Sequence, residues 1–140
     1  MAWVVDTCLL LDIGLDDPEF AERSENLVLQ MSSAGVLISP VTFVELAPAF
    51  GGDLDGLKNF LMGLGIDFEE MWDLVDTENA ALGWAEHILK RRTGGGLKRP
   101  VADVLIGSFA LRFQGLLTRN AKDFQKLFPQ LRVVEPCNWG

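Results

Sequence analysis

Short apolar runs alternate with longer amphipathic segments along the chain. The runs at residues 2–6, 36–39, 66–68, 116–117 and 132–135 predict strands, because they are short and largely apolar. The segments between them predict helices, which cover residues 16–33, a stretch from Pro40 to no later than Gly51, and residues 54–63, 78–92, 101–113 and 121–127. Strands that alternate with helices and are apolar on both faces predict an α/β fold, in which a parallel sheet forms the middle of a three-layer α/β/α sandwich.

Length and composition indicate one domain over residues 1–140. About half of the residues are hydrophobic, which is enough for a sizeable core, and no run of 18 apolar residues predicts a membrane span. The first residues carry no basic segment of a signal peptide. Two cysteines and one histidine are too few for a disulfide framework or a structural zinc site. We therefore expect a cytoplasmic protein.

The net charge of −8 conceals a strong asymmetry between the two parts of the chain. Residues 1–89 hold two basic and seventeen acidic residues, whereas residues 90–140 hold ten basic and three acidic ones. The basic residues Arg91, Arg92, Lys98, Arg99 and Arg119 predict contacts with a polyanion such as RNA. The alternative for residues 90–99 is a solvated helix end and loop, because cations are favourable at a helix C-terminus.

Four carboxylates, Asp6, Glu45, Asp103 and Asp123, lie at the end of a predicted strand or near the start of a predicted helix. Ligands of open parallel sheets bind beyond the carboxyl ends of the strands, where Asp6 and Thr118 are expected. Each acid also has an ordinary interpretation as a helix cap or a first-turn acid, and Thr42 with Glu45 matches a capping box. The four together are more specific than any one of them.

A cluster of carboxylates is costly without a cation. Two like charges 4 Å apart repel by roughly 4 kcal/mol at an effective dielectric constant of 20. The acids of such a cluster are therefore either partly protonated or bound to a metal ion.

The order and spacing of short motifs around these acids resemble the PIN domain family, in particular the VapC-type toxins of toxin–antitoxin pairs. The motifs are Asp6-Thr7, Val44-Glu45-Leu46, Ala102-Asp103-x-x-Ile106-Gly107, the segment from Leu117 through Thr118, Arg119 and Asn120 to Phe124, and Val133-Val134-Glu135-Pro136. The resemblance implies a metal-dependent ribonuclease that binds Mg²⁺ or Mn²⁺ at the acidic site. It also implies a homodimer that is inhibited by an antitoxin.

By this resemblance, Asp6, Asp103 and Glu45 are the expected metal ligands, with Asp123 in the catalytic set. Two positions depart from the family's pattern. Cys8 stands where the family usually has Ser, Thr or Asn, and Asn120 stands where it usually has its fourth acid. Asn120 could bind the metal through its carbonyl oxygen, or Asp123 could replace the missing acid. Both departures leave room for reduced activity.

Two other functions remain open from the sequence. One is a binding module with a PIN-like fold and an inactive site. The other is a phosphoacceptor receiver domain, which is disfavoured because no strand-end Asp occurs in the middle of the chain. His87 is expected to be an exposed helix residue without a catalytic role.

Overall fold

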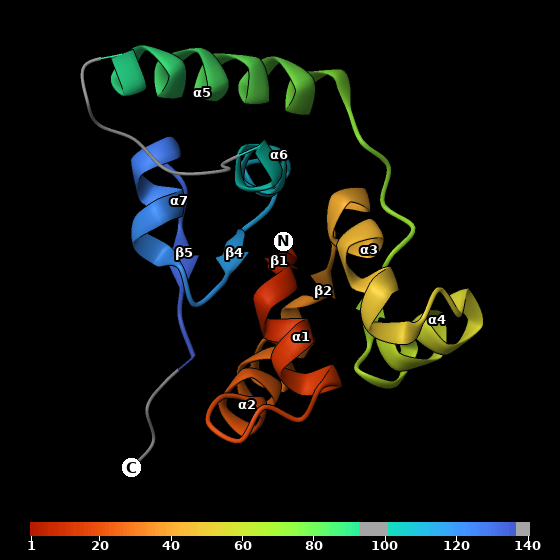
Figure 1. Cartoon of the computed structure of the whole chain (residues 1–140). Helices are drawn as coiled ribbons and strands as arrows, with labels where there is room; N and C mark the ends of the chain where they lie inside the picture. Colours follow the sequence, from red (N-terminus) through yellow and green to blue (C-terminus); the bar gives the residue numbers. More distant parts are fainter. Residues whose placement is uncertain (93–100, 137–140) are drawn as a thin grey trace.

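The structure, a computed structural model, describes residues 1–92 and 101–136, with side chains described up to Leu89 and again from Val101. Within these residues a five-stranded sheet has the order β3-β2-β1-β4-β5, and all neighbouring strands are parallel (Figure 1). The strands are β1 (Trp3–Val5), β2 (Val36–Leu37), β3 (Ile66–Asp67), β4 (Gly115–Leu117) and β5 (Val133–Val134). The predicted strands are confirmed, each within a few residues of its expected ends.

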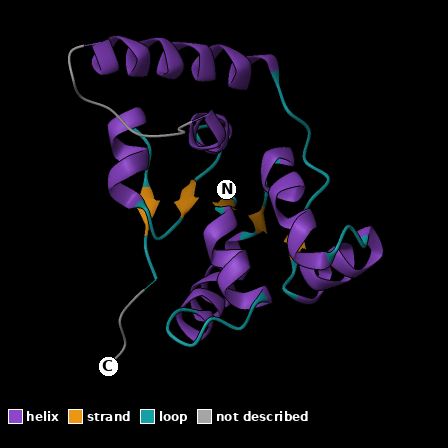
Figure 2. Ribbon diagram, in the orientation of Figure 1, coloured by secondary structure: helices purple, strands orange, loops and turns teal. Residues whose placement is uncertain are grey.

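Helices connect the strands (Figure 2). They are α1 (Thr7–Gly14), α2 (Ala21–Met31), α3 (Pro40–Leu46), α4 (Leu54–Gly63), α5 (Leu74–Arg92), α6 (Val101–Ala110) and α7 (Ala121–Leu127), with 3₁₀ turns η1 (Ser32–Ala34) and η2 (Ala47–Phe50). The sequence pattern did not predict α1, and it began α5 too late. The turn η2 contains Pro48, which cannot continue the hydrogen bonds of α3.

Side chains of each central strand alternate between two apolar clusters. Trp3 and Val5 pack with residues of α1, α2 and α4, whereas Val4 packs with residues of α5, α6 and α7. Helix α5 lies across α6 and α7 on the side away from the sheet (Figure 1). The expected three-layer α/β/α sandwich is therefore confirmed.

Two glycines let α5 and α6 approach the end of α7. A Cβ on Gly107 would lie 2.7 Å from the Phe128 ring, and a Cβ on Gly83 would lie 2.9 Å from it. Phe128 is buried between these two helices because neither position carries a side chain. Gly107, which belongs to the late-helix motif, therefore has a packing role of its own.

The register of β1 and β4 brings their carboxyl ends together. Val5 pairs with Leu117, and the N–H of Asp6 donates to the carbonyl of Leu117 at 2.9 Å. Asp6 and Thr118 therefore leave the sheet side by side. Helix α3, which follows β2, packs against both α1 and α6 and brings its residues to the same edge.

No membrane-spanning segment was expected from the sequence. Among the helices in residues 1–92 and 101–136, none has both the length and the apolar composition needed to cross a bilayer.

Candidate functional site

Asp6 is buried at the end of β1, with 4% of its surface exposed. One oxygen, Oδ1, accepts from the Thr7 N–H at 2.8 Å, so Asp6 is the N-cap of α1, as its ordinary interpretation predicted. The other oxygen, Oδ2, accepts from Thr118 Oγ1 at 2.6 Å and from Cys8 Sγ at 3.3 Å. Burial raises the pKa of Asp6, and these hydrogen bonds oppose that effect. Capping therefore accounts for only one of its two oxygens.

Asp103 lies half-buried in the first turn of α6. Burial raises its pKa to about 7, and the nearby charges of Asp6, Asp123 and Glu45 raise it further in that order. Within the part of the chain that the structure describes, no Lys or Arg forms an ion pair with Asp103. The carboxylate therefore lacks a described positive partner.

Glu45 lies in the last turn of α3, and its side chain is exposed. The alternative interpretation of Thr42 and Glu45 as a capping box is wrong. Ser39 is the N-cap of α3, because its hydroxyl accepts from the Thr42 N–H at 3.2 Å and Pro40 occupies the first helical position. Instead, Glu45 Oε1 accepts a hydrogen bond from Thr7 Oγ1 at 2.6 Å. This bond attaches Glu45 to the residue that follows Asp6.

Asp123 lies in the first turn of α7 and is half-buried, and its charge acts on Asp103. Asn120 occupies the N-cap position of this helix, but its side chain makes no capping hydrogen bond. The backbone N–H of Asn120 donates to Thr118 Oγ1 at 3.0 Å, and the same hydroxyl donates to Asp6. Asn120 is therefore connected to the acidic site through its backbone, and its side chain is exposed.

The fold thus gathers all four predicted acids at one edge of the sheet, close enough for Asp6, Glu45 and Asp123 to act on Asp103. In residues 1–92 and 101–136, however, no three acidic, His or Cys side chains stand close enough together to hold one metal ion. The donor set is oxygen, which suits Mg²⁺ or Mn²⁺, and Mg²⁺ keeps several waters and needs only one or two carboxylates. The residues therefore fit a hard divalent cation that is only partly coordinated by protein.

The chain is similar in architecture to several solved structures. No protein-family model and no curated protein sequence matches the chain. VapBC-1 from nontypeable Haemophilus influenzae matches 96% of this chain and 98% of its own, with a TM-score of 0.67 and 16% identity. VapBC2 from Rickettsia felis, solved bound to a DNA fragment from the promoter, matches over the same shares with a TM-score of 0.61 and 16% identity. FitAcB from Neisseria gonorrhoeae matches 97% of this chain and 98% of its own, with a TM-score of 0.60 and 19% identity.

The chain has the PIN fold of the VapC-type toxins. The resemblance read from the motifs is thereby confirmed for the fold, over nearly the full length of the chain. At this level of identity, the similarity shows the architecture only. The activity has to be inferred from the residues of the site.

Cys8, a departure from the family's pattern, contacts the site through its thiol. Its Sγ lies 3.3 Å from Asp6 Oδ2 and 3.7 Å from Thr118 Oγ1. Burial, with the charge of Asp6 next, raises the pKa of Cys8 to about 12. The thiol is therefore neutral at pH 7 and serves as a hydrogen-bond donor to Asp6, in the place where a PIN domain usually has a hydroxyl or amide.

Of the predicted RNA-binding residues, the structure describes the side chain of Arg119 alone. Arg119 does not present a free guanidinium, because Nε and Nη2 donate to the two oxygens of buried Asp12 at 2.8 and 2.9 Å. Its guanidinium also lies 4.1 Å from the centre of the Phe20 ring. Arg91 and Arg92 belong to α5, but their side chains are outside the described set, and Lys98 and Arg99 are outside the described residues.

The expectation that His87 is exposed is wrong. His87 is 3% exposed and its ring stacks on Trp84, with centroids 5.7 Å apart. Its Nε2 has no hydrogen-bond partner among the described residues. The 19-residue helix α5 turns His87 toward the interior, on the same buried side as Ala80 and Gly83.

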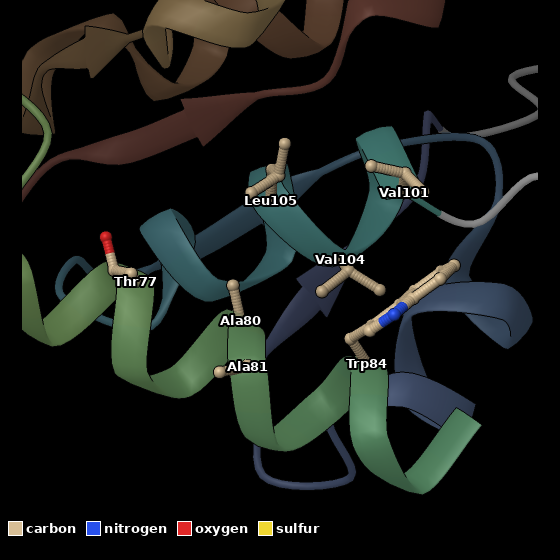
Figure 3. Close-up of a pocket in the computed structure, with 7 residues that line it drawn as sticks. All are labelled: Thr77, Ala80, Ala81, Trp84, Val101, Val104 and Leu105. Atoms are coloured by element: carbon tan, nitrogen blue, oxygen red, sulfur yellow. The ribbon is translucent and has the colours of Figure 1, made fainter. Parts of the chain in front are cut away.

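An apolar pocket of about 300 Å³ lies between α5 and α6 (Figure 3). It is lined by Thr77, Ala80, Ala81, Trp84, Val101, Val104 and Leu105. Among the described residues that line it, none is charged, and the hydroxyl of Thr77 already accepts from Trp72 Nε1 at 2.6 Å. This described lining offers no groups for hydrolytic chemistry, and the acidic edge of the PIN sheet is the candidate site.

The hydroxyls that hold this edge together were not among the site residues predicted from the sequence. Thr7, Thr42 and Thr118 are all buried, and each makes a hydrogen bond at or beside a site carboxylate. The adjacency of Thr7 to Asp6 was a usable signal. Thr42 could not be found in this way, because its partner Thr7 lies 35 residues earlier in the chain.

Proposed function

We propose that this chain is a metal-dependent endoribonuclease that cleaves phosphodiester bonds of RNA and serves as the toxin of a toxin–antitoxin pair. The observation that carries the proposal is the pairing of two acids, buried Asp6 and half-buried Asp103, at the ligand-binding edge of a PIN fold, without a described cation to neutralise them. Isolated buried charges are costly, and perturbed acids of this kind concentrate at functional sites.

Each acid has a proposed role. Asp6, Asp103 and Glu45 would hold Mg²⁺ or Mn²⁺, with the carbonyl oxygen of Asn120 as a further ligand. A divalent ion bound there would supply an activated water and neutralise charge on the phosphate. Asp123, which stands in the first turn of α7, would orient that water.

The partners follow from charge and from the matched complexes. We assign RNA contacts to Arg91, Arg92, Lys98 and Arg99, since Arg119 is engaged by Asp12. The matched structures include VapBC complexes, and VapBC2 from Rickettsia felis was solved bound to a DNA fragment from the promoter. We accordingly propose a cognate antitoxin, a homodimeric toxin and a cytoplasmic RNA target.

The decisive experiment replaces Asp103 by Asn and measures Mn²⁺ binding together with cleavage of a mixed-sequence RNA. We expect the variant to keep its circular dichroism spectrum and to lose Mn²⁺-dependent cleavage, because it loses a charged ligand. Asp55→Asn is the matched control, since Asp55 is exposed on α4. Undiminished cleavage by Asp103→Asn in Mn²⁺-replete buffer would refute the assignment.

One observation favours a second function, a PIN-like binding module without activity. No three described acids converge on one ion position, and both departures from the family's pattern, Cys8 and Asn120, lie beside the site. Titration with Mn²⁺ separates the two functions. Absence of binding at millimolar Mn²⁺ would support the inactive module and exclude the nuclease.

A further inference from the structure

Thr7 makes hydrogen bonds to two of the site carboxylates. Its backbone N–H donates to Asp6 Oδ1 at 2.8 Å, and its hydroxyl donates to Glu45 Oε1 at 2.6 Å. The two acids come from different parts of the fold, the end of β1 and the last turn of α3. Thr7 therefore connects these two parts of the fold through the two carboxylates.

A second hydroxyl, that of Thr42, lies beside the bond to Glu45. Thr42 Oγ1 lies 3.1 Å from Thr7 Oγ1, and Thr42 is fully buried. A threonine hydroxyl has a single proton, and the carboxylate oxygen can only accept when ionised. We therefore assign the proton of Thr7 to the bond with Glu45, which makes Thr42 the donor to Thr7. The result is a directional chain from Thr42 through Thr7 to Glu45.

Without this chain, nothing described would hold Glu45 in place. Glu45 is exposed on α3, it has three side-chain torsions, and its charge is repelled by Asp6. A hydrogen bond to a charged acceptor is stronger than a neutral one, and its 2.6 Å length is typical of that class. It occupies Oε1 and leaves Oε2 available to a ligand.

We propose that Thr7 is a positioning residue that fixes the Glu45 carboxylate relative to Asp6 for a divalent cation, and that Thr42 orients the Thr7 hydroxyl. This inference rests on the proposed function, because the cation is the one expected there. Hydrogen-bonding partners of metal ligands act in this way in other sites, and their loss commonly lowers metal affinity by about 10- to 100-fold.

The test is Mn²⁺ binding by electron paramagnetic resonance in wild type, Thr7→Val, Thr7→Ser and Thr42→Val. Valine has nearly the shape of threonine and keeps the N–H that bonds Asp6, so Thr7→Val removes the hydrogen bonds of the Thr7 hydroxyl to Glu45 and Thr42 and keeps the one to Asp6. We expect its Mn²⁺ affinity to fall about 10-fold or more. Thr7→Ser should restore the affinity, and Thr42→Val should lower it about 3-fold, since the Thr7 hydroxyl remains but is no longer oriented.

The carboxyl ¹³C resonance of Glu45 in metal-free protein supplies a second measurement. The signal is assigned by its loss in Glu45→Gln. It should move in Thr7→Val and return in Thr7→Ser, a pattern that a general loss of stability would not produce. If Thr7→Val does not fold, the Thr42→Val and Thr7→Ser spectra decide the question in the same way.

The outcomes distinguish this inference from the proposed function. Wild-type Mn²⁺ affinity in a folded Thr7→Val variant overturns the positioning role, while the nuclease proposal stands. If wild type binds no Mn²⁺ but the Glu45 signal responds to Thr7→Val, the proposed function and the role toward a cation are both lost. The hydrogen-bonded connection between the acids then remains as a structural feature.

Discussion

Two pairs of buried or half-buried acids in this molecule differ in whether an arginine neutralises them. Asp12 and Asp76 each face an arginine that binds both carboxylate oxygens. Arg119 donates to Asp12 at 2.8 and 2.9 Å, and Arg112 donates to Asp76 at 2.9 Å through both Nε and Nη2. Asp6 and Asp103 have no such partner among the described residues, although Asp6 is as buried as Asp12.

The difference separates structural acids from candidate site acids. A buried charge is tolerated when it is paired and hydrogen-bonded, and the two arginines do this for Asp12 and Asp76. At the acidic edge, hydroxyl, thiol and backbone donors stabilise Asp6, but they carry no positive charge. A cation from solution would therefore be stabilised most strongly at that edge. Substitutions in the two pairs of acids test this difference between them.

The largest effect is expected from Asp76→Ala. Asp76 is fully buried, and it accepts from the Asp73 N–H at the start of α5 as well as from Arg112. Its removal leaves the partly buried guanidinium of Arg112 with only a long contact to Glu70 and a bond to the Met71 carbonyl, so the free energy of unfolding should fall by about 3 kcal/mol. Urea denaturation measures this. Glu70→Gln is the control and should change stability by less than about 0.5 kcal/mol, because Glu70 meets Arg112 at 3.5 Å and is 38% exposed.

Asp103→Asn should raise the free energy of unfolding of the metal-free protein, whereas Asp76→Ala lowers it. Above pH 7 the Asp103 carboxylate is ionised in an environment that disfavours the charge. A neutral side chain removes that penalty, so the free energy of unfolding at pH 8 should rise by about 1–3 kcal/mol. Destabilisation of the metal-free protein by this variant would show that Asp103 is a structural acid like Asp76.

The same shift predicts the pH dependence of stability. The pKa of Asp103 is about 7 in the folded chain, above its ordinary value of 3.8. Between these values the folded state holds a proton that the unfolded state has released. Raising the pH therefore lowers the free energy of unfolding, by at most about 1.4 kcal/mol per pH unit.

The difference between wild type and Asp103→Asn isolates this contribution from other titrating groups. Denaturation in chelator at intervals from pH 4.5 to 8 measures it. A difference that stays constant over this range would contradict the assigned shift.

The smallest effect is expected from Asn120→Asp, which supplies the acid that the family's pattern leads one to expect. The side chain is exposed, so metal-free stability should change by less than about 0.5 kcal/mol. Mn²⁺ affinity should rise about 3-fold, because one more carboxylate faces the ion. Unchanged affinity would mean that position 120 does not reach the site.

Much of the fold followed from local pattern. The helices at 54–63 and 121–127 have the predicted bounds, since each begins and ends at clear local signals. Helix α1 was missed because it directly follows a buried strand and continues its apolar character through Leu9 and Leu10. His87 was misplaced because burial on a long helix depends on which neighbours cover it.

The candidate site was likewise only partly predictable from the sequence. Residue type and order predicted which acids would gather, because strand ends of a parallel sheet share one edge. The role of Arg119 could not be predicted in this way, since Asp12 lies 107 residues away and only folding brings the two together.

By itself, the sequence determined the alternation of strands and helices, the charge asymmetry and the four acids at the ends of elements, since these depend on neighbours along the chain. The tertiary structure decided which acids are neutralised by arginine, which are held by threonine hydroxyls, and which are left without a described cation. Those outcomes depend on distances of a few ångströms between residues far apart in the chain, and such distances are fixed only when the helices pack on the sheet.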